Sequence, residues 1–127
     1  MKIFKNNKTG FTMIELLVVT TIIIVLTTIG LVSFTTANRN ARNGKRKADL
    51  EMVRQALVLY RVDAGSYPSG TVFSTMISTI SEYTSATEVT DPKNDATYFY
   101  AYSSDGSTFT LTAILEPDGT AYPLSSP

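Results

Sequence analysis

The chain divides into a continuous apolar stretch near its start and a longer region of mixed composition behind it. Residues 16–34 read LLVVTTIIIVLTTIGLVSF, where threonine, serine and glycine are the only interruptions. Because a helix rises 1.5 Å per residue, about 20 such residues span the hydrocarbon core of a bilayer. The pattern predicts a hydrophobic transmembrane helix over residues 11–37.

Apolar side chains then recur at the spacing of a helix: Ala48, Met52, Ala56, Tyr60 and Ala64 at steps of four, with Val53 and Leu57 beside them. This is the apolar stripe of an amphipathic helix, and we expect a stem helix over residues 38–65. Gly65 suits the C-cap, and Pro68 prevents continuation. Gly30 is a weak helix former, and the segment 38–44 contains several more. The helix therefore either continues through these two places or bends or melts there.

The remaining residues, 66–127, have the pattern of a small α+β head. The first apolar group suits a short amphipathic helix: Phe73, Met76, Ile77, Ile80 and Tyr83. From Thr97 the period becomes two, and the strand 108–115 alternates threonines with apolar side chains. Residues 120–124 supply a third short strand. We predict a long N-terminal helix packed on an antiparallel meander of about three strands.

Composition excludes several kinds of site. The 127 residues contain no cysteine and no histidine, so there is no disulfide and no Cys/His metal site. The common nucleophile triads, phosphate loops and HExxH helices are missing, and we expect neither an enzyme nor a cofactor. Carboxylates gather near the late turns: Asp91, Asp95, Asp105, Glu116 and Asp118. Their spacing is not that of a calcium loop, so we expect solvated turn acids and no metal.

Formal net charge is zero, but bases gather at two places. Lys2, Lys5 and Lys8 precede the apolar stretch. A second group follows it: Arg39, Arg42, Lys45, Arg46 and Lys47. We expect weak contact of this second group with lipid headgroups, with acidic heads of neighbouring copies or with nucleic acid. Nucleic acid is disfavoured because no aromatic residue interleaves the bases.

The most informative residues stand where the apolar stretch begins. Glu15 is the last charge before Arg39, and a carboxylate in lipid is costly, which indicates a function and a partner. The basic leader, Gly10, Phe11 and Glu15 together resemble the class III signal of type IV prepilins and pseudopilins. Residues 45–68, which end in Gly65-Ser66-Tyr67-Pro68, are also similar to major pseudopilins and related small pilins.

The resemblance implies a structural subunit of a type IV pilus or pseudopilus. A prepilin peptidase/methyltransferase would remove the leader, residues 1–10, by cleavage after Gly10, and would methylate the amine of Phe11. The leader would face the cytoplasm, and the chain would stay in the cytoplasmic membrane until an inner-membrane assembly platform adds it to a filament. The filament would be a helical homo-oligomer, extracellular or periplasmic.

Glu15 lies one helical turn from Phe11, so the new amine and the carboxylate are able to pair within one chain or between neighbours. Pairing between chains would fix the register of assembly. The simpler interpretation is a glutamate favoured by the helix dipole at a helix start.

Other interpretations of the apolar stretch also stay open. An ordinary secretory signal and a plain single-pass anchor both account for it, although neither explains Gly10, Phe11 and Glu15 together. At the level of function, the alternative is a monomeric membrane-anchored module whose head or basic stem binds a ligand or DNA.

Overall fold

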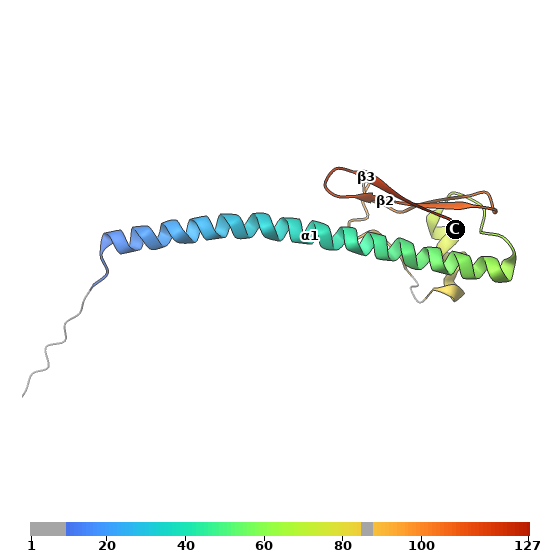
Figure 1. Ribbon diagram of the computed structural model, residues 1–127, viewed down its shortest axis with the longest axis horizontal. Helices are drawn as coiled ribbons and strands as arrows, with labels where there is room; N and C mark the ends of the chain where they lie inside the picture. The colour runs from blue at the N-terminus through green and yellow to red at the C-terminus, as the bar shows by residue number, and fades with distance from the viewer. Residues whose placement is uncertain (1–9, 85–87) are drawn as a thin grey trace, which may run out of the picture. The chain divides into compact units, whose positions relative to one another are not determined.

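The computed structural model describes residues 10–84 and 88–127. Its elements are α1 (Met13–Ala64), α2 (Phe73–Thr79), a 3-10 turn η1 (Ser81–Tyr83), β1 (Ala101–Ser104), β2 (Phe109–Leu115) and β3 (Thr120–Ser125) (Figure 1). Contacts divide the chain into two compact units, one up to Ala37 and one from Asn38. Apart from Gly10, the predicted leader lies outside the described residues.

The described part of the first unit consists of the start of α1 and the short segment before it. Its apolar side chains are all exposed, and α1 is the one helix in 10–84 and 88–127 that is long and apolar enough to cross a membrane. The threonines satisfy their hydroxyls locally, as Thr21 does by donating to the Leu17 carbonyl at 2.7 Å. α1 continues without a break through Gly30 and through residues 38–44, the two places where a bend or a melted segment was considered.

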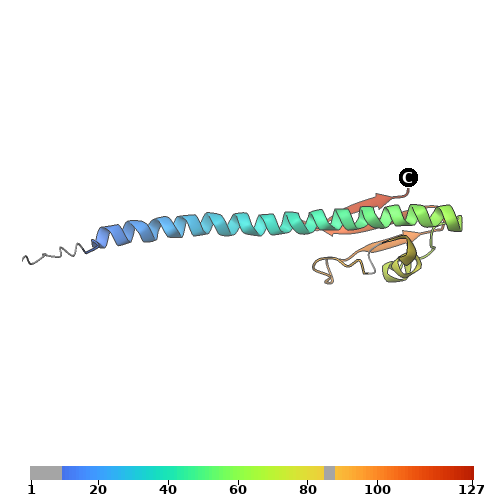
Figure 2. The ribbon, with the colours of Figure 1, turned by 90° about the horizontal axis from the view of Figure 1, so that it is seen from below.

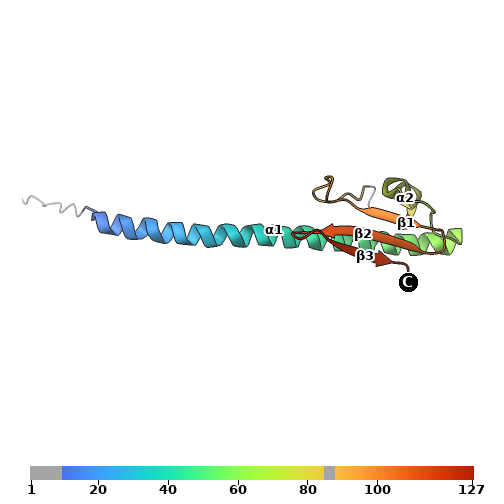
Figure 3. The ribbon, with the colours of Figure 1, turned by 90° about the horizontal axis from the view of Figure 1, so that it is seen from above.

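The second unit holds an antiparallel sheet in the order β1-β2-β3, and its strands run along the 38–64 part of α1 (Figure 3). Ser104 pairs with Phe109, and Leu111 pairs with Leu124. In β2, Phe109, Leu111 and Ala113 are buried while Thr110 is exposed, so the predicted alternation is confirmed. α2 lies beside β1 at the edge of the sheet away from β3 (Figure 2).

The core of the head forms between the stem part of α1, α2 and the sheet. The side chains of Leu50, Val53 and Leu57 have no exposed surface. Tyr67, just beyond α1, packs edge-on against Phe109 with ring centroids 4.7 Å apart. The predicted α+β fold, a long N-terminal helix with an antiparallel three-stranded head, is therefore confirmed.

The stem stripe differs in detail from the sequence prediction. Ala56 is buried as expected, but Ala48 and Ala64 are exposed, and Leu50 is buried in their place. The reason is geometric: steps of four residues turn 400°, so each step drifts 40° around the helix. Five such positions wind off the face that the sheet covers.

Two other boundaries have local causes. Gly65 has a φ of +80° and donates to the Arg61 carbonyl at 2.8 Å, which confirms the predicted C-cap. The first strand was expected from Thr97 but begins at Ala101. The Asp95 carboxylate accepts the N–H groups of Thr97 and Tyr98 at 2.9 and 2.8 Å, and this turn keeps the segment out of the sheet.

Candidate functional site

The start of α1 is closed by a reciprocal cap. The Glu15 Oε2 atom accepts the backbone N–H of Thr12 at 2.8 Å and the Thr12 hydroxyl at 2.9 Å. The Thr12 Oγ1 atom in turn accepts the Glu15 N–H at 3.3 Å. This is a capping box, in which a threonine and a glutamate three residues later satisfy the free donors of the first turn.

The capping box gives Glu15 a partner that the sequence prediction did not name. We expected the Phe11 amine; in the uncleaved chain the nitrogen of Phe11 is a peptide group, and the described contacts bring Glu15 to Thr12 instead. The T-x-x-E spacing of residues 12–15 is the signal that would have identified this contact. Both hydrogen bonds from Thr12 use Oε2, and within residues 10–84 and 88–127 no contact occupies Oε1.

The predicted cleavage position is open. Phe11 is 84% exposed, and a Cβ added at Gly10 would meet no atom within 4 Å. Within the described chain, packing therefore gives no reason for glycine at residue 10. If glycine is required at residue 10, the requirement would have to come from a partner protein that binds this segment.

A second polar site lies inside the head, around Arg46. The side chain of Arg46 has no exposed surface. Its Nε and Nη2 atoms donate to the two oxygens of Asp91 at 2.6 and 3.0 Å, and its Nη1 atom donates to Glu116 at 3.0 Å. A planar guanidinium is suited to such bidentate pairing.

The cluster continues to the surface through Glu116. Arg42 donates to both Glu116 oxygens at 2.7 and 2.6 Å, and Lys93 lies 3.3 Å away. The Asn43 side chain donates to the Glu116 carbonyl at 2.7 Å and accepts its N–H at 3.0 Å. The β2–β3 turn is thereby fastened to α1.

The cluster lowers the pKa of both buried carboxyl groups. Hydrogen bonds from Arg42, and secondly from Arg46 and Lys93, lower the pKa of Glu116 from 4.5 to about 2. Burial by itself would raise the pKa of Asp91. The hydrogen bonds from Arg46 and from two backbone N–H groups outweigh burial, so the pKa of Asp91 lies below its usual value.

These contacts correct two expectations about charged residues. Asp91 and Glu116 are buried ion-pair partners and not solvated turn acids, whereas Asp95 and Asp105 cap exposed turns. Arg46 has no surface to offer to lipid or nucleic acid. The sequence carries no signal for these pairs, because Asp91 and Glu116 lie 45 and 70 residues from Arg46.

The other predicted contact residues are also separated by the structure. Arg42 is held by Glu116, and Lys45 donates to Asp49 at 2.8 Å. Lys47 lies 5.3 Å from the centre of the Tyr122 ring. Arg39 is exposed, and within the described residues its side chain has no carboxylate or aromatic partner. In the same part of the chain no group of acidic side chains is arranged to hold a metal ion.

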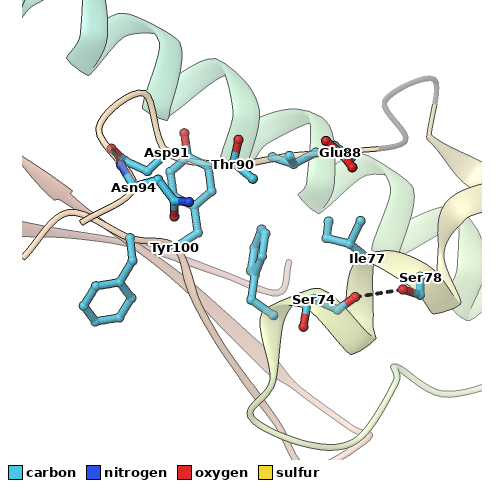
Figure 4. A pocket seen from close by; sticks show the side chains of 11 residues that line it. Ser74, Ile77, Ser78, Glu88, Thr90, Asp91, Asn94 and Tyr100 are labelled. Atoms are coloured by element: carbon cyan, nitrogen blue, oxygen red, sulfur yellow. Dashed lines mark hydrogen bonds between the residues drawn. The ribbon is translucent and has the colours of Figure 1, made fainter. Parts of the chain in front are cut away.

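A hollow of about 520 Å³ opens between α2 and the segment 88–100 (Figure 4). Its apolar walls include Phe73, Ile77 and Phe99. Its polar walls include Glu88 and Asn94, while Ser78 donates to the Ser74 carbonyl at 3.0 Å within α2.

The long apolar helix and the three-stranded head define a pilin-like α+β fold. Residues 5–31 match the family model described as the prokaryotic N-terminal methylation motif. These residues therefore carry the class III prepilin signal, which is typical of type IV pilins and pseudopilins. Pilin-family proteins are structural and not enzymatic, which agrees with the expectation from the sequence. Comparison with curated proteins and with solved structures gives no significant match.

The motif implies processing by a prepilin peptidase. Together with the hydrophobic helix, it indicates insertion into a membrane followed by assembly at the surface or in the periplasm.

Proposed function

We propose that this chain is a structural subunit of a type IV pilus or pseudopilus filament. Residues 1–10 are the cleaved leader, 11–37 the filament-core helix, 38–65 the stem and 66–127 the head. One observation carries the proposal. Within and just after the methylation motif, the apolar side chains at the start of α1 are exposed over two dozen residues, with Glu15 as the only charge. Such a surface needs lipid first and neighbouring helices after assembly.

The geometry at Glu15 supports the pairing that assembly requires. Cleavage after Gly10 would turn the Phe11 nitrogen into an amine, with Thr12 still present as the N-cap. The cap occupies Oε2 of Glu15 and leaves Oε1 to accept a donor. The Phe11 amine of the next subunit is a cation that would satisfy this oxygen in the apolar core, where an unpaired charge is costly.

The partners in this proposal are the prepilin peptidase/methyltransferase, the inner-membrane assembly platform, membrane lipid and further copies of the chain. The subunit would leave the cytoplasmic membrane for an extracellular or periplasmic filament.

The first test concerns processing. In a sheared filament fraction, mass spectrometry should find chains that begin at N-methylated Phe11. Gly10→Val should accumulate as uncleaved precursor in the membrane and give no filaments, because the peptidase would meet a side chain at the residue before the cut. Normal processing of this variant would contradict the assignment of Gly10.

A matched pair of variants separates the charge of Glu15 from its capping role. Glu15→Gln keeps a side chain that is able to close the capping box, whereas Glu15→Val removes cap and charge together. Both should be cleaved and inserted normally, and both should fail to form filaments. Filaments from Glu15→Gln but not from Glu15→Val would assign capping as the essential role. Filaments at the wild-type level from both would overturn the proposal.

The second candidate is a monomeric membrane-anchored binding module, which the hollow beside α2 favours. A binding module would remain in the membrane fraction and would yield no sheared filaments from wild-type cells.

A further inference from the structure

We propose that the hollow between α2 and the segment 88–100 receives the Arg39 side chain of a second copy of this chain. The inference rests on the proposed function, because a filament is what would bring the two copies together. One half of the contact is Arg39, which has no charged or aromatic partner among residues 10–84 and 88–127. The other half is a pocket whose chemistry suits a long cation (Figure 4).

Arg39 stands apart from the other cations of residues 38–127. Five of them meet a carboxylate at 3.3 Å or less: Arg42, Lys45, Arg46, Arg54 and Lys93. Lys47 and Arg61 lie over the rings of Tyr122 and Tyr67. In the part of the chain that the structure describes, the side chain of Arg39 has neither kind of partner, although it is exposed at the start of this unit.

The hollow has the complementary character. Phe73 and the 47% exposed Phe99 supply aromatic surface, against which the planar guanidinium and the methylenes of an arginine pack well. Two carboxylates lie in its wall, but Arg46 already binds Asp91. Glu88 remains, exposed and without a partner among the described side chains, so the hollow carries one uncompensated negative charge.

The charge balance points to a second copy as the source of the cation. Residues 38–127 contain eight bases and ten acids, so copies of this unit have the same negative net charge and repel each other when they pack together. A contact between Arg39 of one copy and an acid of the next would reduce this repulsion. Arg39 does not contact the hollow of its own chain within the described residues. In a contact between copies, the Arg39 side chain of one copy would pair with Glu88 of the other and would also cover the exposed ring of Phe99.

Crosslinking in assembled filaments tests the contact directly, because the chain has no cysteine of its own. Arg39→Cys and Glu88→Cys would be made as separate variants, co-expressed at full length, and treated with a short bis-maleimide in sheared filaments. We expect a covalent dimer that joins the two variants, identified by mass spectrometry. Asp118→Cys replaces Glu88→Cys in the control, because Asp118 is an exposed acid outside the hollow. A 39–88 dimer no more abundant than the 39–118 dimer would overturn the proposal.

A charge exchange gives an independent answer, also where a cysteine variant assembles poorly. Arg39→Glu and Glu88→Arg should each lower filament yield by about fivefold, the effect of about 1 kcal/mol at one exposed pair. The double variant should regain most of the yield. Lys47→Glu combined with Glu88→Arg makes the same charge change and should not regain it.

The outcomes separate the two levels of the hypothesis. Absence of filaments from the wild-type chain would refute the proposed function itself. Normal filaments without rescue by the exchange would refute the Arg39–Glu88 contact alone. A loss of membrane-inserted precursor in every Arg39→Glu variant, rescued or not, would assign Arg39 to lipid headgroups and would also overturn the contact.

Discussion

At the scale of single residues, the head depends on one buried arginine. Arg46 binds Asp91 and Glu116 at once, so a single guanidinium holds two segments that lie far apart in the sequence. Removal of one partner from a buried ion pair typically destabilises a protein by about 3–5 kcal/mol, because the other charge stays buried. The cluster is therefore a point at which pH acts on the whole head.

We predict that acid weakens the head through Glu116. Its pKa is about 2 in the folded chain against 4.5 when unperturbed, so its stabilising contribution is complete above pH 4.5 and is lost as pH falls toward 2. The lowered pKa of Asp91 acts in the same direction. The unfolding free energy of the full-length protein in detergent should fall across this range, measured by tyrosine near-UV circular dichroism. All seven tyrosines lie in 38–127, and there is no tryptophan.

The matched variants are Glu116→Gln and Asp118→Asn. Glu116→Gln should have a lower unfolding free energy than the wild type at neutral pH, and this free energy should change less between pH 4.5 and 2. Asp118→Asn, at an exposed turn, should show the same pH dependence of the unfolding free energy as the wild type. A wild-type curve with no slope in this range would show that the cluster does not hold the head together.

Local chemistry was predictable from sequence at this scale, and remote pairing was not. Gly10 and Glu15 stand out because their neighbours make them unusual, and Thr12 was missed although its spacing to Glu15 was visible. Arg46 looked like one base among five. Only the fold brings it to Asp91 and Glu116, and burial of a charge leaves no mark on the residues adjacent in sequence.

At the scale of elements, the periodicity of apolar residues predicted which helices and strands form better than it predicted where they begin. The alternation of β2 was predictable because one face of a strand repeats every two residues without drift. The stem stripe was only partly predictable, because the sheet selects which part of a drifting pattern is covered. The start of β1 depended on the side chain of Asp95, which propensity for strands does not include.

A pair of neighbouring positions in β2 tests this assignment. Leu111→Ala should lower the unfolding free energy by about 2–5 kcal/mol, because Leu111 is fully buried and the change leaves a cavity. Thr110→Ala, on the exposed face of the same strand, should change it by no more than about 0.5 kcal/mol. Chemical denaturation in detergent measures both values. Equal effects would contradict the assignment of the buried face.

At the scale of the whole molecule, the two units differ in how they treat their apolar side chains. The first leaves its apolar surface exposed, and the second buries its own around Leu50, Leu57 and Leu111. The long apolar helix and the three-stranded head were predictable from the sequence, because an uninterrupted apolar run differs from an amphipathic or alternating pattern. The sequence did not predict the hollow beside α2, which depends on how α2 and the segment 88–100 pack.

Processing should also change the charge of the molecule. The uncleaved chain has 11 bases and 11 acids, and the leader contains three lysines and no acid. The mature chain therefore keeps eight bases against 11 acids. Isoelectric focusing should place it below the precursor, whose sequence pI is about 6.2. Gly10→Val should stay at the precursor position. Co-migration of wild-type filament and precursor bands would show that the lysines are retained.

The fastening of the β2–β3 turn has a mechanical consequence. The strands run along the stem (Figure 3). Arg42, Asn43 and Arg46 bind the β2–β3 turn through charged and amide groups near the start of the second unit. A pull on the head along the stem would load these bonds in shear, together with the apolar contacts. Tension and acid would then weaken the same hydrogen bonds and ion pairs, so the head of a stretched subunit should unfold at a higher pH than that of a relaxed one.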